Sequence, residues 1–525
     1  MKLIFLLLSC LLCSSWMYAQ SSAFKVGTPY KVVTAQKKYY ISDPANNLLL
    51  SIKDRNNKIV LQRFDLTTLK EINRSDKITL PPLSYVYDII RIHGRVYLIQ
   101  VHYNSNRQHL SVFAQQIDPF HCTLFGEPVL LLEGSDIGSI TLQQRGEDGD
   151  VLLLGFKNNL LSLENNQQRV AYSKVLGKDL TTIGACELTF PHKRRQVDIV
   201  DYHLDQQGVP YILTKVRPSK SSRRDVIGKG ENAIINYQLE ILKFNLADGS
   251  YTTIPIKLDK HQIKSSWLYA GANGQVICTG FYTKRESKTT EPDGVFVFNI
   301  DQANKLLKHH HYEFPIEILT QYKNARQQSR IAHADRKGHA EMNNLKLNKI
   351  VVDSDNSLVI IGEVEFIITS TNTTTNGGTF TRTTYHYYDI LVTKINADGS
   401  LAWMRKLPKR QIGSRGRGSM SFKHLKLNDQ HYFIFLDHPN NEIVNVYELA
   451  NIYADGRRGV LSAYQVDDAT GKTRKAQILD TKKNKSNYKF VRFNVDRVIP
   501  FIPAGIVIEF HKKAQQDILV YIGLD

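Results

Sequence analysis

Cysteine is scarce in this chain, and long apolar runs are absent after its first residues. Five cysteines occur in 525 residues. Three of them, Cys122, Cys186 and Cys278, lie beyond the apolar N-terminal segment. They show no CxxC spacing and are too few for a disulfide scaffold, so we expect buried free thiols, with one disulfide as the alternative in an oxidising compartment. No later segment reaches the roughly 20 apolar residues that a membrane helix needs, so we expect no transmembrane segment.

Signatures of catalysis and of metal binding are also missing. The chain contains no GxSxG, no phosphate-binding loop and no dinucleotide fingerprint. The consecutive histidines at 309–311 would point to opposite faces of a strand, so one strand cannot aim all three at a single ion. Asp353 and Asp355 resemble the start of a calcium loop, but Leu358 occupies the turn position that needs glycine. We therefore expect no metal and no cofactor, and no residue can be named as catalytic.

The N-terminus is typical of an export signal. Lys2 precedes an apolar run at 3–12, and small residues lead to Ala19. We predict a signal peptide at 1–19 and a single domain at 20–525. Cys10 makes lipidation a less favoured alternative. The expected location is the periplasm, the cell surface or the medium.

Helical periodicity is nearly absent after the signal, and short runs of alternating apolar and polar residues replace it. One unit recurs: a strand that ends near Asp or Asn, a short turn, and another strand. It occurs at 58–73, 109–124, 239–252, 294–308, 389–403 and 459–475. Two of these turns share the letters ADGS, at 247–250 and 397–400. Asp-Gly between alternating strands is a strong hairpin signal.

Another strand pair precedes each unit, which predicts an all-β chain folded as a β-propeller of four-stranded antiparallel blades. We predict eight blades, with seven as the alternative. Their ranges are 37–80, 81–133, 134–191, 192–260, 261–314, 343–408, 420–481 and 487–525. The last range holds three good strands, so the strand at 30–34 is expected to complete its sheet and join the two chain ends. One inserted segment, 316–342, has a helical pattern.

The run DILVTKINADGSLAW at 389–403 resembles the repeat of secreted bacterial β-propeller proteins, many of them uncharacterised. The signal ending in Ala-Gln is similar to that of exported proteins of the Bacteroidetes. The first resemblance is strongest over 340–410. It implies the fold and export, and it carries no catalytic residues with it.

In a propeller the strand connections alternate between the two ends of the ring. Connections from first to second strands and from third to fourth strands are short here. The long segments join second to third strands or successive blades; they are 218–232, 284–292, 371–386, 438–458, 316–342 and 409–419. Long loops in a compact fold are usually functional or disordered. We call the end that they share the long-loop face and expect a site there.

The long-loop face also carries a large share of the positive charge. The chain has a net charge of +18, and these six segments hold 19 Lys/Arg and 10 Asp/Glu. Guanidinium and ammonium groups suit carboxylate, sulfate or phosphate. The candidate binding residues are Arg223, Arg224, Lys284, Arg285, Arg326, Arg330, Lys409, Arg410, Arg415 and Arg417. Solvated loops that use charge to stay soluble are the alternative explanation.

These observations predict an exported binding or scaffold propeller that engages an anionic polysaccharide or an envelope protein through the long-loop face. The alternative is a carbohydrate-active enzyme, a hydrolase or a lyase, with its site on the same face. Nucleic acid is not an expected partner of an exported chain. The sequence leaves the oligomeric state open.

Overall fold

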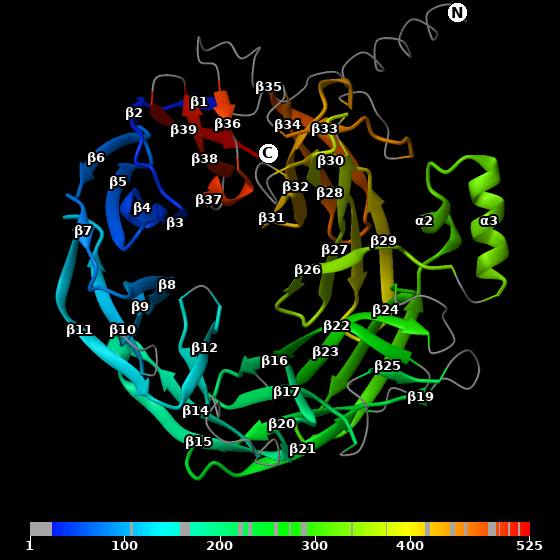
Figure 1. The fold of residues 1–525 in the computed structure, drawn as a ribbon, viewed down its shortest axis with the longest axis horizontal. Coiled ribbons are helices and arrows are strands. Elements are labelled where there is room, and N and C mark those ends of the chain that lie inside the picture. The colour runs from blue at the N-terminus through cyan, green and yellow to red at the C-terminus, as the bar shows by residue number, and fades with distance from the viewer. Residues whose placement is uncertain are drawn as a thin grey trace, which may run out of the picture.

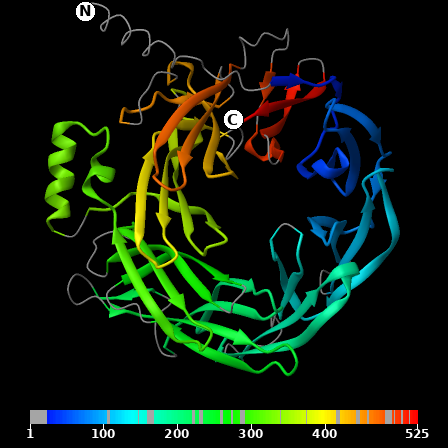
Figure 2. The ribbon, with the colours of Figure 1, turned by 180° about the vertical axis from the view of Figure 1, so that it is seen from behind.

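The computed structural model is a ring of antiparallel sheets (Figure 1), which Figure 2 shows from behind. It describes residues 24–104, 109–146, 148–157, 168–218, 224–228, 234–256, 261–271, 275–284, 291–337, 340–373, 375–414, 420–441, 447–455, 459–480, 490–492, 494–501, 505–512 and 515–524. The predicted signal peptide lies outside the described residues. No helix among the described residues is long and apolar enough to cross a membrane.

The first sheets of the ring follow one another along the chain. The first contains β3 (Lys37–Asp43), β4 (Leu48–Arg55), β5 (Lys58–Asp65), β6 (Lys70–Arg74) and β7 (Ile78–Thr79). The second contains β8 (Ser84–Ile92), β9 (Arg95–Tyr103), β10 (Leu110–Asp118) and β11 (Thr123–Gly134). The third contains β12 (Ile137–Gln144), β13 (Val151–Lys157), β14 (Gln168–Leu176) and β15 (Thr182–Lys193).

The next sheets keep the same order of strands. The fourth contains β16 (Val197–Leu204), β17 (Pro210–Val216), β20 (Gln238–Phe244) and β21 (Tyr251–Ile256), with a small hairpin of β18 (Val226–Ile227) and β19 (Ile234–Ile235) between β17 and β20. The fifth contains β22 (His261–Ala270), β23 (Val276–Lys284), β24 (Gly294–Ile300) and β25 (Leu306–Glu313). The sixth contains β26 (Leu345–Val352), β27 (Leu358–Thr373), β28 (Thr379–Ile395), β29 (Leu401–Leu407), β30 (Gln411–Gly413) and β33 (Tyr453–Ala454).

The last two sheets lead to the C-terminus. The seventh contains β31 (Lys423–Leu427), β32 (Gln430–Asp437), β34 (Val460–Asp467) and β35 (Thr473–Asp480). The eighth contains β36 (Phe490–Arg492), β37 (Val498–Phe501), β38 (Gly505–Lys512) and β39 (Gln516–Gly523), together with β1 (Phe24–Val26) and β2 (Tyr30–Lys31). The short helices are η2 (Pro44–Asn46), η3 (Lys178–Leu180), α2 (Ile316–Thr320), α3 (Ala325–Asp335), η5 (Pro439–Asn441) and η6 (Val495–Arg497).

The predicted fold, a propeller of four-stranded antiparallel blades with a helical insertion, is confirmed. Each predicted blade range contains most strands of one of these sheets, and β3, β8, β12, β16, β22, β26 and β31 lie nearest the middle of the ring (Figure 1). The number of blades stays a prediction.

The core lies between neighbouring sheets, because each sheet is covered on both faces. All seven residues of β24 are buried, Phe296 and Phe298 among them. The sequence of a strand that is buried on both faces is a continuous apolar run, without alternation of apolar and polar residues. Each fully buried Phe contributes roughly 1.5–3 kcal/mol to stability. Cys122 and Cys278 are buried in this core, and Cys186 is half-buried; all three are free thiols, as expected.

The N-terminal segment closes the ring, as the sequence predicted for its strand at 30–34. Tyr30 pairs with Asp517, and Phe24 pairs with Ile522, both on β39. Between these pairs the Gly27 N–H donates to the Leu519 carbonyl at 2.9 Å. Only glycine fits there, since a Cβ at Gly27 would lie 2.4 Å from the Leu69 carbonyl oxygen. We call the contact between segment 24–36 and β39 the closure seam.

The strand order places the six long segments between second and third strands or between sheets, as expected, but two of them are not loops. Segment 371–386 belongs largely to β27 and β28, which form one long hairpin. Segment 316–342 contains two helices, α2 and α3, instead of one, and they are separated at Tyr322, whose φ is 48°. Several of these segments contact one another. The Met342 N–H donates to the Pro292 carbonyl, and β30 pairs with both β28 and β33.

Candidate functional site

The closure seam contains a cavity of about 390 Å³, which we call the closure pocket. Its lining comes from both ends of the chain: Val32, Val33, Thr34, Ala35, Lys38, Arg497, His511, Gln515 and Asp517. The volume lies within the range of small-molecule sites. The pocket lies at the end of the ring where β3 and β37 begin, which by strand alternation is the long-loop face.

Glu509 on β38 is a buried carboxylate that contacts Lys38 and Arg497, two residues that line this pocket. It is fully buried, and Tyr30 and Tyr40 donate their hydroxyls to it at 2.6 and 2.7 Å. Lys53 and Lys38 approach it at 2.6 and 2.5 Å. Burial alone would raise the pKa of Glu509, but the lysines and Arg497 hold that pKa well below its ordinary value. Glu509 is therefore a permanent anion that binds the N-terminal part of the chain to β38.

The cations around Glu509 outnumber the carboxylates. Lys38, Lys53 and Arg497 face two carboxylates, Glu509 and Asp517. Burial lowers the pKa of Lys38, and repulsion from Lys53 and Arg497 adds to this effect, while the attraction of Glu509 opposes it. By formal charge, the described residues around Glu509 therefore supply three cations and two carboxylates. Burying an excess charge costs free energy unless a counter-charge accompanies it.

Arg497, in η6, carries a buried side-chain nitrogen that lacks a hydrogen-bond partner among the described residues. Its Nη1 is buried without a hydrogen bond, and its nearest anion is a Glu509 oxygen at 3.8 Å. Arg497 also lines the closure pocket. A buried guanidinium nitrogen without an acceptor is costly, and it is satisfied when a planar anion binds to it.

His511 and Asp517 form a pair on the opposite wall. The Nδ1 of His511 lies 2.9 Å from an Asp517 oxygen, and the Asp517 side chain is 1% exposed. His511 remains 28% exposed, so its ring reaches the pocket. This pairing orients the imidazole and leaves Nε2 available to a ligand.

The structure does not gather the ten residues proposed from the sequence at this pocket, and none of them lines it. Arg223, Arg285, Arg415 and Arg417 lie outside the described residues. Arg224, Arg326 and Arg330 are exposed, and Lys284 forms an ion pair with Glu313 at 2.7 Å.

The sequence suggested that Lys409 and Arg410 bind a ligand, but in the structure both side chains contact other residues of the protein. Lys409 is fully buried and bonds Glu363 at 2.8 Å, so it presents no charge at the surface. Arg410 is half-buried and stacks over the ring of Tyr388, 5.3 Å from its centroid. In a Lys- and Arg-rich segment, sequence alone does not show which cation finds an internal carboxylate.

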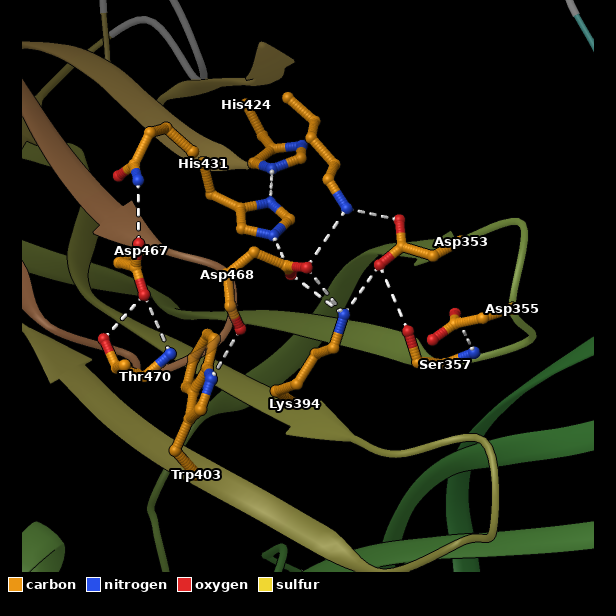
Figure 3. Close-up of polar contacts among 12 residues, drawn as sticks. Asp353, Asp355, Ser357, Lys394, Trp403, His424, His431, Asp467, Asp468 and Thr470 are labelled. Atoms are coloured by element: carbon orange, nitrogen blue, oxygen red, sulfur yellow. Dashed lines mark hydrogen bonds and ion pairs between the residues drawn. The ribbon is translucent and has the colours of Figure 1, made fainter. Parts of the chain in front are cut away.

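A second polar cluster joins the sixth and seventh sheets (Figure 3), and we call it the inter-sheet network. Its members are Asp353, Lys394, His424, Lys426, His431 and Asp468. Lys394 lies 2.6 Å from Asp353 and 2.9 Å from Asp468. Lys426 reaches the same two carboxylates at 2.5 and 3.4 Å. Two lysines therefore balance two aspartates.

Two stacked histidines extend the inter-sheet network. His431 Nε2 lies 2.7 Å from Asp468, and His431 Nδ1 lies 3.0 Å from His424 Nε2. Burial lowers the pKa of both rings, most strongly that of His424. Asp353, which resembled the start of a calcium loop, therefore binds two lysines here. The network lines neither the closure pocket nor a further cavity, which is described next.

The second cavity, of about 450 Å³, lies at Arg145, His203 and Tyr269. Burial lowers the pKa of His203 to about 4, and its Nδ1 accepts the N–H of Ala270. Arg145 is paired with Asp150 at 3.0 Å. The charges here are already matched, so the closure pocket is the stronger candidate site.

No protein-family profile matches the chain, and no curated protein matches it. Among solved structures, a prolyl endopeptidase aligns over 94% of this chain and 55% of its own, at 10% identity and a TM-score of 0.40. This chain therefore spans about half of that enzyme's length. The β-propeller domain of the Trilobed protease from Pyrococcus furiosus aligns over 90% and 99%, at 10% identity and a TM-score of 0.36. The polysaccharide lyase Uly1 aligns over 97% and 94%, at 10% identity and a TM-score of 0.31. These likenesses concern overall architecture and no particular residue.

Sequence reasoning found the strand that closes the ring but missed the site that this closure creates. One signal was present: Glu509 interrupts the apolar run GIVIEF at 505–510. A carboxylate in an otherwise buried strand needs partners. Those partners, Tyr30, Tyr40, Lys38 and Lys53, lie more than 450 residues away in the chain.

Proposed function

We propose that this protein is an exported binding protein that holds an acidic glycan at the closure pocket, with an anionic group of the sugar seated against Arg497. The observation that carries this proposal is the buried Arg497 Nη1, which has no hydrogen bond and lines a cavity with excess positive charge. A carboxylate or a sulfate ester would satisfy that nitrogen and neutralise the excess charge.

Exposed cations elsewhere on the long-loop face, away from the pocket in Figure 1, support the same ligand class. Arg326 and Arg330 on α3 and Arg224 are exposed. Exposed cations of this kind attract a polyanion over a Debye length of about 8 Å at physiological ionic strength. Each contributes roughly 0–1 kcal/mol to binding. In this proposal the closure pocket binds one anionic group of the glycan, and the exposed arginines of the long-loop face attract the rest of the polymer.

Calorimetric titration with defined oligosaccharides tests this function. Oligoglucuronate is expected to bind, a neutral cello-oligosaccharide of equal length is not, and a sulfated cello-oligosaccharide shows which anion fits better. The R497A variant is expected to lose roughly tenfold or more in affinity for oligoglucuronate, because a charged hydrogen bond contributes about 1.5–3 kcal/mol.

The double variant R326A/R330A removes two exposed cations and is the matched control. We expect it to bind oligoglucuronate within about threefold of the wild type. Binding that survives R497A but fails in the control would place the site on α3. Equal binding of neutral and acidic sugars would refute the proposal and favour docking of an envelope protein.

If the pocket is catalytic, its groups favour a lyase over a hydrolase. A glycosidase needs a carboxyl group that stays protonated near neutral pH, and the pKa of Glu509 is held far below that range. His511, oriented by Asp517, is instead suited to take a proton from a carbon next to a carboxylate. Ultraviolet absorbance of an unsaturated uronate product, present in the wild type and absent in H511Q, would support a lyase. Its absence with intact binding would support a binding protein.

A further inference from the structure

We propose that anion binding in the closure pocket and the seating of segment 24–36 on β39 are coupled, so that the bound anion latches the ring. This inference rests on the proposed binding function and concerns the regulation of that same site.

The walls of the pocket come from the two sides of the closure seam. Val32, Val33, Thr34 and Ala35 belong to the N-terminal segment, and Lys38 follows it. Arg497, His511, Gln515 and Asp517 belong to the C-terminal part of the chain. If segment 24–36 leaves β39, four of the nine lining residues leave the pocket. The anion therefore has a complete site only while the ring is closed.

The seam that holds this segment is short. The register with β39 covers three residues of β1 and two of β2. Two further bonds join the segment to this strand and to the residue before it, from the Gly27 N–H to the Leu519 carbonyl and from the Val32 N–H to the Gln515 carbonyl, both at 2.9 Å. For comparison, β10 and β11 are paired at eight positions. Short pairings at chain ends are where local opening costs the least free energy.

Closing the seam also adds a hydrogen bond to Glu509. Glu509 accepts the hydroxyl of Tyr30 from the segment itself, which favours closure. Lys38 on β3 and Lys53 on β4 lie outside the segment, so the charges around Glu509 stay together when it leaves. An anion against Arg497 is enclosed by Val32, Val33, Thr34 and Ala35 only in the closed state. It therefore binds the closed state more tightly, which is the condition for shifting the equilibrium.

Linkage requires the effect to act in both directions. A bound anion must lower the population of molecules in which segment 24–36 is open, and a change that lowers the closed population must weaken anion binding in proportion. This holds even where the change touches no residue of the pocket.

Hydrogen exchange on the wild-type protein tests the first direction. Saturating oligoglucuronate is expected to slow exchange of the amides in segment 24–36 by roughly tenfold, within the usual range of coupling. The neutral cello-oligosaccharide is expected to leave exchange unchanged, and R497A is expected to show no protection by oligoglucuronate.

The second direction is tested by G27A. This position lines no part of the pocket, yet a Cβ there would meet the Leu69 carbonyl oxygen at 2.4 Å and so weaken the seam. We expect its affinity for oligoglucuronate to fall by roughly fivefold or more. The control is G155A on β13, in the third sheet, where a Cβ would meet Leu132 Cδ2 at 2.5 Å. That variant is expected to lose stability but keep the wild-type affinity.

The outcomes separate the two proposals. If wild-type protein does not bind oligoglucuronate, the proposed function is wrong. If it binds but exchange in segment 24–36 is unaffected, the coupling is wrong and the binding function stands. The exchange measurement needs no variant, so it decides the matter even if G27A fails to fold. Equal loss of affinity in G27A and G155A would also contradict the coupling.

Discussion

The closure pocket and the inter-sheet network contain similar residues but have different charge balances. Each brings lysines, carboxylates and a histidine from distant strands to one place. In the network, Lys394 and Lys426 face Asp353 and Asp468, so the formal charges cancel (Figure 3). At the closure pocket, three cations face two carboxylates, and a cavity opens beside them. A charge cluster that is balanced by its own members stabilises the fold. A cluster with excess charge and space beside it can accept a ligand.

Burial separates the two regions further. Lys53 and Glu509 are both fully buried, whereas Lys426 is 24% and Asp468 18% exposed. Water can therefore replace part of a lost interaction in the network, but not at Lys53. Removing one charge should therefore lower the free energy of unfolding more at the Lys53–Glu509 pair than in the inter-sheet network.

The largest expected effect is that of E509Q. This change leaves the buried Lys53 with only the more distant Asp517, at 3.6 Å, as its anion, and breaking a buried ion pair costs about 3–5 kcal/mol. Urea unfolding followed by circular dichroism measures the loss. The double variant K53M/E509L removes both charges and should recover much of the stability. A loss below about 1 kcal/mol in E509Q would show that water reaches Lys53 and that the contrast with the network is wrong.

A smaller effect is expected from D468N in the inter-sheet network. Lys394, Lys426 and His431 each lose a charged acceptor, but the amide still accepts a hydrogen bond and the site is partly exposed. We expect a loss of roughly 1–2 kcal/mol in the same unfolding assay. A loss equal to that of E509Q would mean that burial does not separate the two clusters.

As the pH falls, the inter-sheet network should lose its contribution to stability before Glu509 does. Burial lowers the pKa of His424 and His431 in the fold, so the unfolded chain takes up protons first as the pH falls. Their contribution to stability is complete above the unfolded pKa of about 6.5 and declines below it. Glu509 also has a lowered pKa, but its contribution declines only below the unfolded value of about 4.3.

Unfolding midpoints measured across pH test this order. The variant H424Q/H431Q should show a flatter dependence than the wild type between about pH 6.5 and 5. In E509Q, the unfolding midpoint should change with pH as in the wild type over that interval. It should depend less on pH than the wild type only at lower pH. The reverse pattern would assign the acid sensitivity to the seam.

The smallest effect on stability is expected from R497M. Because the closure pocket has one cation in excess, removing Arg497 should change the free energy of unfolding by no more than about 0.5 kcal/mol without ligand. The matched variant K426M, which unbalances the network, should be more destabilised. Thermal unfolding compares the two. Strong destabilisation by R497M would show that Arg497 is a structural partner of Glu509 and not a ligand site.

Much of the architecture could be predicted because it depends on local patterns. Alternation in DILVTKINADGSLAW and its relatives marks strands and Asp-Gly turns, and each predicted range contains most strands of one sheet. The strand at 30–34 was recognised as the missing partner of the last sheet, and β2 pairs with β39. Loop lengths separated the two ends of the ring because strand order alone determines where a connection emerges.

The local pattern failed where long-range pairing decided the outcome. Segment 371–386 has the Thr-, Asn- and Gly-rich composition of a loop, yet it continues β27 and β28 because the two strands pair with each other. Lys409 has basic neighbours in sequence, but Glu363, 46 positions earlier, lies beside it in the fold and takes its charge. Charge counted along the sequence does not show which charges are already paired.

The sequence by itself therefore determined the strands, their order, the ring and the excess of positive charge, since hydrophobic period and turn chemistry act over a few residues. Only the tertiary structure decided where that charge is left without a partner. Lys38 and Lys53 meet Glu509, Asp517 and Arg497 because closure of the ring brings the two ends of the chain together. An electrostatic interaction depends on distance in space and on burial, and neither is encoded in spacing along the chain.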